Sequence, residues 1–189
     1  MKARLQFSLL VLLMVVTIAC IALAVWFQPR SISTIARDIY RTDFHGRKND
    51  LINFESDTQS LRPLLGKLPA SVPNDLQEYL DNCIPNRGVF IYGAGIDVHS
   101  LGGLSSEHTD TVPGINVLPH GFFCFASDGG GAQIAFCVHD SAIYHLDTSA
   151  GSGNATVQSI RSEALNRWGT LREFLLYVEQ QQEGFHGDP

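Results

Sequence analysis

The chain has 189 residues, with 13 Lys and Arg against 19 Asp and Glu, and its formal net charge is −6. Residues 73–160 contain one base, Arg87, and nine acids, a balance of 1 − 9 = −8. A surface of this sign repels phosphate backbones and attracts basic proteins, so the composition argues against a nucleic-acid partner. The length favours one compact domain in addition to the N-terminal segment.

The N-terminal segment contains an almost purely apolar run at residues 7–27. As a helix at ~1.5 Å per residue, this run would be about 31 Å long, which matches the hydrocarbon core of a bilayer. We therefore expect residues 1–30 to be a retained single-pass membrane anchor. A cleaved signal peptide and a lipoprotein signal at Cys20 are the alternatives. Bases such as Arg30 and Arg37 follow the run, so the positive-inside rule favours, by a narrow margin, a cytoplasmic domain.

Residues 31–65 are expected to be a juxtamembrane helix and a linker. Apolar side chains recur there at helical spacing, at Ile32, Ile35, Ala36, Ile39 and Tyr40. Two interpretations are open for this helix. It could lie on an anionic membrane surface, or it could be a stalk that continues the membrane helix. The weak periodicity of residues 45–65 predicts a linker with at most a short helix.

The globular domain is expected at residues 66–182, with a flexible tail at residues 183–189. The spacing of apolar residues predicts a helix with Pro73 in its first turn and a cap near Ser71. A buried strand is predicted after it at Gly88–Tyr92, and a further short strand at Ile96–Val98. Residues 101–114 are rich in Gly, Ser, Thr and acids, which predicts a long exposed loop.

The second half of the domain begins with a phenylalanine-rich run. A glycine turn at Gly129–Gly131 follows it, and residues 133–138 are apolar on both faces, as in a central strand. Residues 143–146 are expected to pair back as an antiparallel hairpin.

The C-terminal part of the domain is expected to be helical. Residues 157–168 show a helical apolar face, and Thr170 and Glu173 have the spacing of a capping box for a last helix that Gly184 ends.

Residues suited to chemistry show no recognisable spacing. Three cysteines beyond the apolar run lack a CxxC pattern and predict buried, unreactive thiols, namely Cys83, Cys124 and Cys137. His139 and His145 could share one face of the hairpin, but ordinary surface histidines are the better interpretation. We therefore expect no catalytic, cofactor-binding or metal-binding residues.

The order of the elements resembles the SUKH superfamily, which includes bacterial immunity proteins of polymorphic toxin systems, the Syd protein and yeast cell-wall-synthesis regulators. The resemblance covers about residues 66–182. The positions that match the family pattern are Phe125, Asp128, Gly129, Gly131, Tyr144, Asp147, Phe174 and Leu175. Ala132 departs from it, since the family usually has Asp or Asn there. The resemblance implies an α+β domain that has a central, mostly antiparallel sheet with flanking helices, binds proteins and is not an enzyme.

Together these features predict a membrane-anchored, non-enzymatic protein-binding domain from a bacterium, with a basic toxin domain as one candidate partner. An immunity-type protein would neutralise such a toxin by direct binding. The acids proposed to contact the partner are Asp97, Glu107, Asp110, Asp128 and Asp140. The alternatives are an extracytoplasmic enzyme or a small-ligand or metal-binding module behind a signal anchor, suggested by histidines such as His99, and a purely structural tethered domain.

Overall fold

The computed structural model describes residues 11, 14–20, 29–42, 51–55 and 59–186. It divides the chain into two compact units, Met1–Ser31 and Ile32–Pro189. Residues 14–20 of the first unit are helical and exposed. Most of the expected membrane span at residues 7–27 lies outside the described residues. Within those that are described, no helix has both the length and the apolar character needed to cross a membrane.

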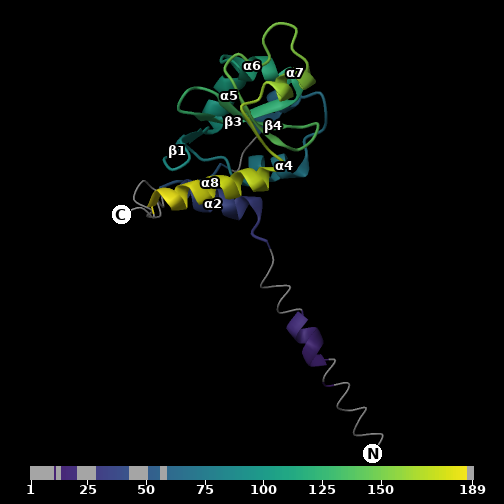
Figure 1. The fold of residues 1–189 in the computed structure, drawn as a ribbon, viewed down its shortest axis with the longest axis vertical. Coiled ribbons are helices and arrows are strands. Elements are labelled where there is room, and N and C mark those ends of the chain that lie inside the picture. The colour runs from purple at the N-terminus through teal and green to yellow at the C-terminus, as the bar shows by residue number, and fades with distance from the viewer. Residues whose placement is uncertain (1–10, 12–13, 21–28, 43–50, 56–58, 187–189) are drawn as a thin grey trace, which may run out of the picture. The chain divides into compact units, whose positions relative to one another are not determined.

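The second unit is built on an antiparallel sheet of six strands, counted over the described residues (Figure 1). The strands are β1 (Val89–Ile91), β2 (Ile96–Val98), β3 (Phe122–Asp128), β4 (Gln133–Cys137), β5 (Ile143–Leu146) and β6 (Asn166–Trp168). Each strand pairs with the next strand in the sequence, so the sheet is a meander. The expected α+β class, with a central antiparallel sheet and flanking helices, is confirmed.

Helices cover both faces of the sheet (Figure 1). One face packs against α2 (Ile32–Arg41), α4 (Asn74–Asn82) and α8 (Leu171–His186). The opposite face packs against α6 (Gly114–Val117) and α7 (Val157–Ser162), and α5 (Leu101–Thr109) lies beside α6. Among the described residues of this unit there are also three short helical segments, namely η1 (Gln59–Leu61), α3 (Arg62–Leu65) and η2 (Leu118–His120).

Strand β4 is the centre of the core, as its sequence predicts. All five of its residues are buried. Ile134 and Phe136 belong to the apolar cluster under α2, α4 and α8, whereas Ala135 and Cys137 belong to the cluster under α6 and α7. Strand β5 pairs with β4 in the expected antiparallel hairpin.

Strand β3 contains a bulge at Phe125. Cys124 pairs with Ala135 and Ala126 pairs with Ile134, so Phe125 has no partner on β4. A bulge interrupts the alternation of side chains between the two faces of a strand. Phe125 and Ala126 consequently both enter the cluster under α2, α4 and α8, and the residues after them change face.

Helix α2 forms where the sequence predicts it, but its apolar face is buried in the core. Ile35 and Ile39 are each 1% exposed, and the Tyr40 hydroxyl lies 3.0 Å from the Tyr79 hydroxyl of α4. The Gln182 amide of α8 donates to the Ile39 carbonyl at 3.4 Å. Neither a membrane-surface helix nor a free stalk has its apolar face enclosed in this way. The compact unit therefore begins at Ile32, whereas the sequence predicts a globular domain that begins at residue 66.

The prediction of an exposed loop at residues 101–114 is wrong, because most of this segment forms α5 and the start of α6. Ser100 caps α5, since its hydroxyl accepts a hydrogen bond from the Gly103 amide at 3.4 Å. Leu104 and His108, one helical turn apart, are buried. This tertiary packing outweighs the low helix propensity of the glycines.

Three smaller expectations also need correction. Helix α7 ends at Ser162, and Trp168 lies in β6 instead of on the same helix. Helix α4 has Pro73 at its N-cap position and no side-chain cap, so the cap expected near Ser71 is absent. Helix α8 continues past Gly184 to His186.

Candidate functional site

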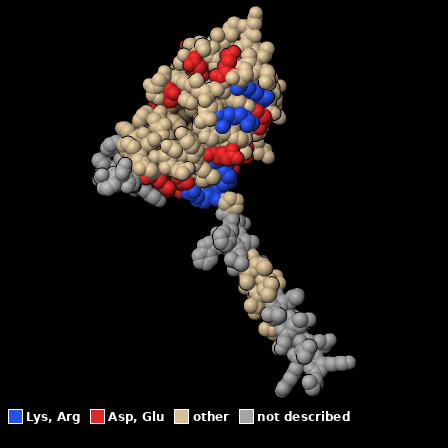
Figure 2. All heavy atoms as spheres, in the orientation of Figure 1, with Lys and Arg blue, Asp and Glu red and all other residues tan. Residues whose placement is uncertain are grey.

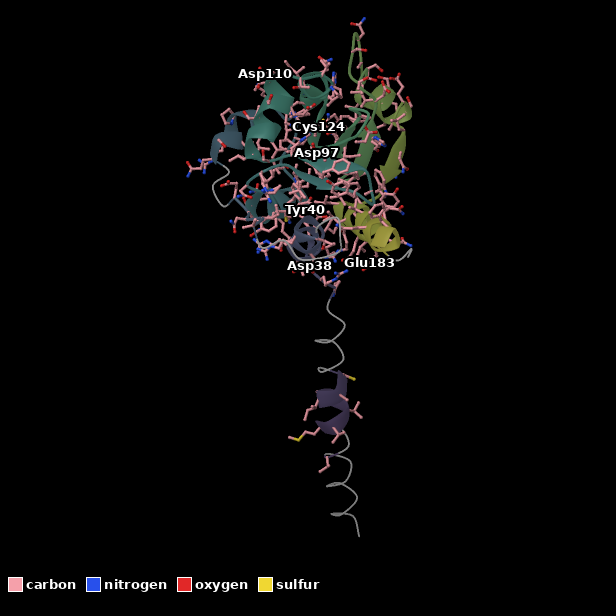
Figure 3. All side chains as sticks on the ribbon, turned by 90° about the vertical axis from the view of Figure 1, so that its left-hand side faces the viewer. Asp38, Tyr40, Asp97, Asp110, Cys124 and Glu183 are labelled. Atoms are coloured by element: carbon pink, nitrogen blue, oxygen red, sulfur yellow. The ribbon has the colours of Figure 1, made fainter. Side chains whose placement is uncertain are left out.

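The five acids proposed for partner contact have different environments. Asp97 and Asp110 are exposed, and neither carboxylate has a hydrogen bond or ion pair with another residue in the described part of the chain. Asp97 lies in the sheet and Asp110 follows α5, and Figure 3 shows that the two side chains are apart. In the view of Figure 2, acidic side chains are spread over the upper part and the lower edge of the domain.

Glu107 is a structural residue, contrary to the prediction. Only 5% of it is exposed, and its Oε1 atom accepts a hydrogen bond from the Gly114 amide at 3.0 Å. Burial raises the pKa of its carboxyl above the usual value, and the Gly114 hydrogen bond opposes this shift. Glu107 therefore connects α5 to α6 and cannot contact a partner.

His108 is a buried polar residue that the sequence analysis did not identify. It is 1% exposed, its Nε2 atom lies 3.1 Å from the Cys124 carbonyl oxygen, and its ring packs 4.6 Å from that of Phe123. Burial lowers its pKa to about 4, so the ring is neutral at pH 7. The spacing of Leu104 and His108 was the signal that could have placed this side chain on a buried helix face.

The environment of His108 predicts that acid destabilises the protein. The pKa of His108 is lowered from 6.5 in the unfolded chain to about 4 in the folded one, so the unfolded state binds more protons between these values. The contribution of His108 to stability is complete above pH 6.5 and is lost as pH falls. We expect the free energy of unfolding to decrease by about 2 kcal/mol between pH 7 and pH 5. The raised pKa of Glu107 acts with the opposite sign, since its contribution is lost as pH rises.

Urea denaturation of the wild type and of His108→Gln at pH 7 and pH 5 measures this effect. The variant is expected to be less stable at pH 7 but to lose less stability than the wild type on acidification. Equal losses in the two proteins would show that other groups cause the acid sensitivity.

The Asp128 carboxylate closes the glycine turn. Its Oδ1 atom accepts hydrogen bonds from the amides of Gly130 at 2.8 Å and Ala132 at 2.9 Å, and its Oδ2 atom lies 3.0 Å from His145 Nε2. Gly131 has a φ of 89°, which confirms that the turn needs a residue able to adopt positive φ. The Asp128 side chain is 30% exposed, and these contacts hold its carboxylate in place.

Asp140 joins α7 and β6 to the β4–β5 hairpin. Its Oδ2 atom accepts a hydrogen bond from the Tyr144 hydroxyl at 2.7 Å and lies 3.3 Å from an Arg161 nitrogen and 3.8 Å from an Arg167 nitrogen. Partial burial raises the pKa of Asp140, but hydrogen bonds from Tyr144 and Ala142 and the charge of Arg161 outweigh it, and the net shift is downward. The carboxylate is therefore ionised and already paired with bases of its own chain.

The other residues of the family pattern also have structural positions. Phe125, Phe174 and Leu175 are buried in the cluster under α2, α4 and α8. Asp147 accepts hydrogen bonds from the amide and hydroxyl of Ser149, at 2.9 Å and 2.7 Å, in the turn after β5. The pattern thus describes packing and turns of the fold.

The cysteines are buried free thiols, as predicted. Cys83, Cys124 and Cys137 are each 0% exposed. Burial raises the pKa of all three thiols, that of Cys83 to about 12, so they stay protonated at neutral pH. Cys124 lies close to His108 and Glu107, but a protonated thiol beside a neutral imidazole is not an activated nucleophile.

The histidines occupy separate sites. His99 Nε2 lies 3.1 Å from the Gln133 Oε1 atom, His145 contacts Asp128, and His139 packs against Gly121. The described residues contain no group of three or more His, Cys, Asp and Glu side chains placed to hold a metal ion.

An exposed strip of the sheet is the remaining candidate site. Phe90 on β1 pairs with Asp97 on β2, Asp97 pairs with Ser127 on β3, and Ser127 pairs with Gln133 on β4. Residues paired in this way project to the same face. Exposure decreases along the row, from 43% for Phe90 to 4% for Gln133, whose Oε1 atom lies 3.1 Å from His99 Nε2. We call the outer part, formed by Phe90, Asp97 and Ser127, the β1–β2 face.

Asp97 was proposed from the sequence as a partner contact, whereas Phe90 was not. The segment around Phe90 was expected to be a buried strand, whereas β1 is buried only on alternate residues. The Phe90 ring lies at 4.9 Å from that of Tyr92, in an edge-to-face arrangement. Because Phe90 pairs with Asp97 across the two strands, this exposed apolar side chain lies beside an unpaired carboxylate.

Comparisons with protein-family models, curated proteins and solved structures find no match to this chain. The resemblance to the SUKH superfamily stays a prediction.

Proposed function

We propose that the chain is a membrane-anchored, non-enzymatic domain that binds a basic protein partner through exposed acidic side chains. The observation that carries this proposal is the charge of residues 73–160, one base against nine acids, together with the unpaired and exposed carboxylates of Asp97 and Asp110. Unpaired surface charges of one sign speed the encounter with a partner of the opposite sign and help to select it.

The positions of the titratable groups also support a binding role. The groups that often serve as nucleophile or base, here Cys124 and His108, are buried and uncharged. The carboxylates of Asp128 and Asp140 hold turns and strands in place.

The proposal of a membrane anchor rests on the sequence alone. The apolar run at residues 7–27 has the length of a bilayer span, and residues 28–31 alone separate it from the start of α2. Such a short connection would limit how far the domain extends from the bilayer, so the partner would be bound near the membrane. If the partner is a toxin, as the SUKH resemblance implies, binding would block its active site, and we favour the cytoplasmic side for this encounter.

Retention of a native partner by the full-length chain tests this function. The chain, solubilised in a mild detergent, is used to capture proteins from its native host at low salt. We expect a basic protein to be retained, and its retention to decrease at least about tenfold in the double variant Asp97→Asn/Asp110→Asn and in 0.5 M salt.

The matched control removes two exposed charges elsewhere. Glu163→Gln/Glu183→Gln also neutralises two acids, but outside residues 73–160. This variant is expected to retain the partner as the wild type does. The proposal fails if the wild type retains no protein, if Asp97→Asn/Asp110→Asn or 0.5 M salt leaves retention unchanged, or if both double variants weaken retention equally.

A further inference from the structure

The β1–β2 face combines an aromatic ring and a carboxylate on directly paired residues. Phe90 and Asp97 are opposite each other in the antiparallel pair of β1 and β2, so their Cβ atoms are about 5 Å apart. Phe90 is 43% exposed, and Asp97 is exposed with no ion-pair or hydrogen-bond partner among the described residues. The helices that cover this side of the sheet, α6 and α7, pack over β3, β4 and β5 instead.

A cationic side chain fits this pair of groups. A guanidinium group can stack on an aromatic ring and direct its N–H groups to a neighbouring carboxylate in the same plane. An ammonium group makes the same contacts as a point charge, without the planar stacking. The acidic balance of residues 73–160 favours the approach of a segment that carries such a side chain.

We propose that Phe90 and Asp97 form a subsite for an arginine side chain of the partner protein. The guanidinium group stacks on the Phe90 ring and donates hydrogen bonds to the Asp97 carboxylate, and Ser127 borders the site on β3. This subsite rests on the proposed function, since it names the place where the basic partner is recognised. It predicts that recognition depends on the aromatic ring as well as on the charge.

Titration of the isotope-labelled full-length chain in zwitterionic detergent micelles, followed by NMR, tests the subsite. The probes are the peptides acetyl-Gly-Arg-Gly-Arg-Gly-amide and acetyl-Gly-Lys-Gly-Lys-Gly-amide. We expect the arginine peptide to shift the amide signals of Phe90 and Asp97 most strongly, and to bind at least about threefold more tightly than the lysine peptide.

The variants separate the ring from the charge. Asp97→Asn and Phe90→Leu are each expected to weaken binding of the arginine peptide at least about threefold, whereas Phe90→Tyr retains it because the ring is kept. The matched charge control is Asp110→Asn, which removes another exposed acid away from the subsite and is expected to leave binding unchanged.

Several results would overturn the subsite. They are an absence of binding by the wild type, equal binding of the two peptides, equal losses in Asp97→Asn and Asp110→Asn, or unchanged binding in Phe90→Leu. Retention of the native partner shows whether only the subsite is wrong or the proposed function is wrong as well. If the wild type and Phe90→Leu retain the partner equally, the subsite is wrong and the binding function stands. If the wild type retains no partner, the proposed function itself fails.

Discussion

A chain that begins at residue 51 is expected to be unfolded, whereas one that begins at residue 30 is expected to fold. The shorter chain lacks α2, whose five apolar residues are all buried in the core, namely Ile32, Ile35, Ala36, Ile39 and Tyr40. Burial of each large apolar side chain contributes roughly 1.5–3 kcal/mol, so the loss is about 6–12 kcal/mol. Because this is comparable to the whole stability of a typical domain, about 5–15 kcal/mol, the shorter chain cannot stay folded.

Far-UV circular dichroism and urea denaturation of the two chains measure this difference. The chain from residue 30 also lacks the apolar run, so it serves as the control for loss of that segment. The chain from residue 51 keeps Ile52, Leu61 and Leu64, which are buried as well, so the comparison isolates the contribution of α2 and the residues joined to it. A cooperative transition with the same midpoint in both chains would contradict the role of α2 in the core.

The regular part of the sheet could be predicted from the sequence because its signals are local. Strand β4 is apolar on both faces, and the turns on either side of it contain Gly129–Gly131 and Asp140–Ser141. The last helix has apolar residues at helical spacing after Thr170, whose hydroxyl accepts a hydrogen bond from the Glu173 amide at 3.1 Å. Such patterns depend on neighbouring residues only, so no knowledge of the tertiary structure is needed.

The elements that the sequence did not predict depend on distant contacts. Helix α5 contains Gly102 and Gly103, so its local propensity is low, and it forms because Leu104 and His108 pack in the interior. The helix α2 was predicted, but its position was not, because an amphipathic helix after an apolar run is equally consistent with a membrane surface.

The candidate site was predicted only in part for the same reason. Charge alone could not separate Asp97, which is exposed, from Glu107, which is buried beside Gly114. Phe90 lies in a segment that was expected to be a buried strand, but the structure leaves one face of β1 uncovered. The face on which Ser127 lies depends on the bulge at Phe125, which no sequence signal indicated.

Replacement of Phe125 by alanine is expected to lower the free energy of unfolding by about 3–5 kcal/mol, the usual range for loss of a buried phenylalanine. The ring is 1% exposed and lies 5.2 Å from the Tyr79 ring of α4 and 5.6 Å from the Phe174 ring of α8. Its removal leaves a cavity where the sheet meets two helices. Phe90→Ala makes the same chemical change at a 43% exposed position and is expected to cost about 1 kcal/mol or less.

Urea denaturation of both variants gives the two free energies, and similar values would contradict the packing described for Phe125.

The Phe125→Ala variant also tests how the β1–β2 face is positioned. Phe125 has no β4 partner, so packing of its ring on α4 and α8 is what favours the bulge over a regular register. A regular register would place Ser127 on the opposite face of the sheet, away from Asp97. Where Phe125→Ala remains folded, changes in the amide signals of Ser127 and Asp97 would therefore show that core packing positions the exposed face.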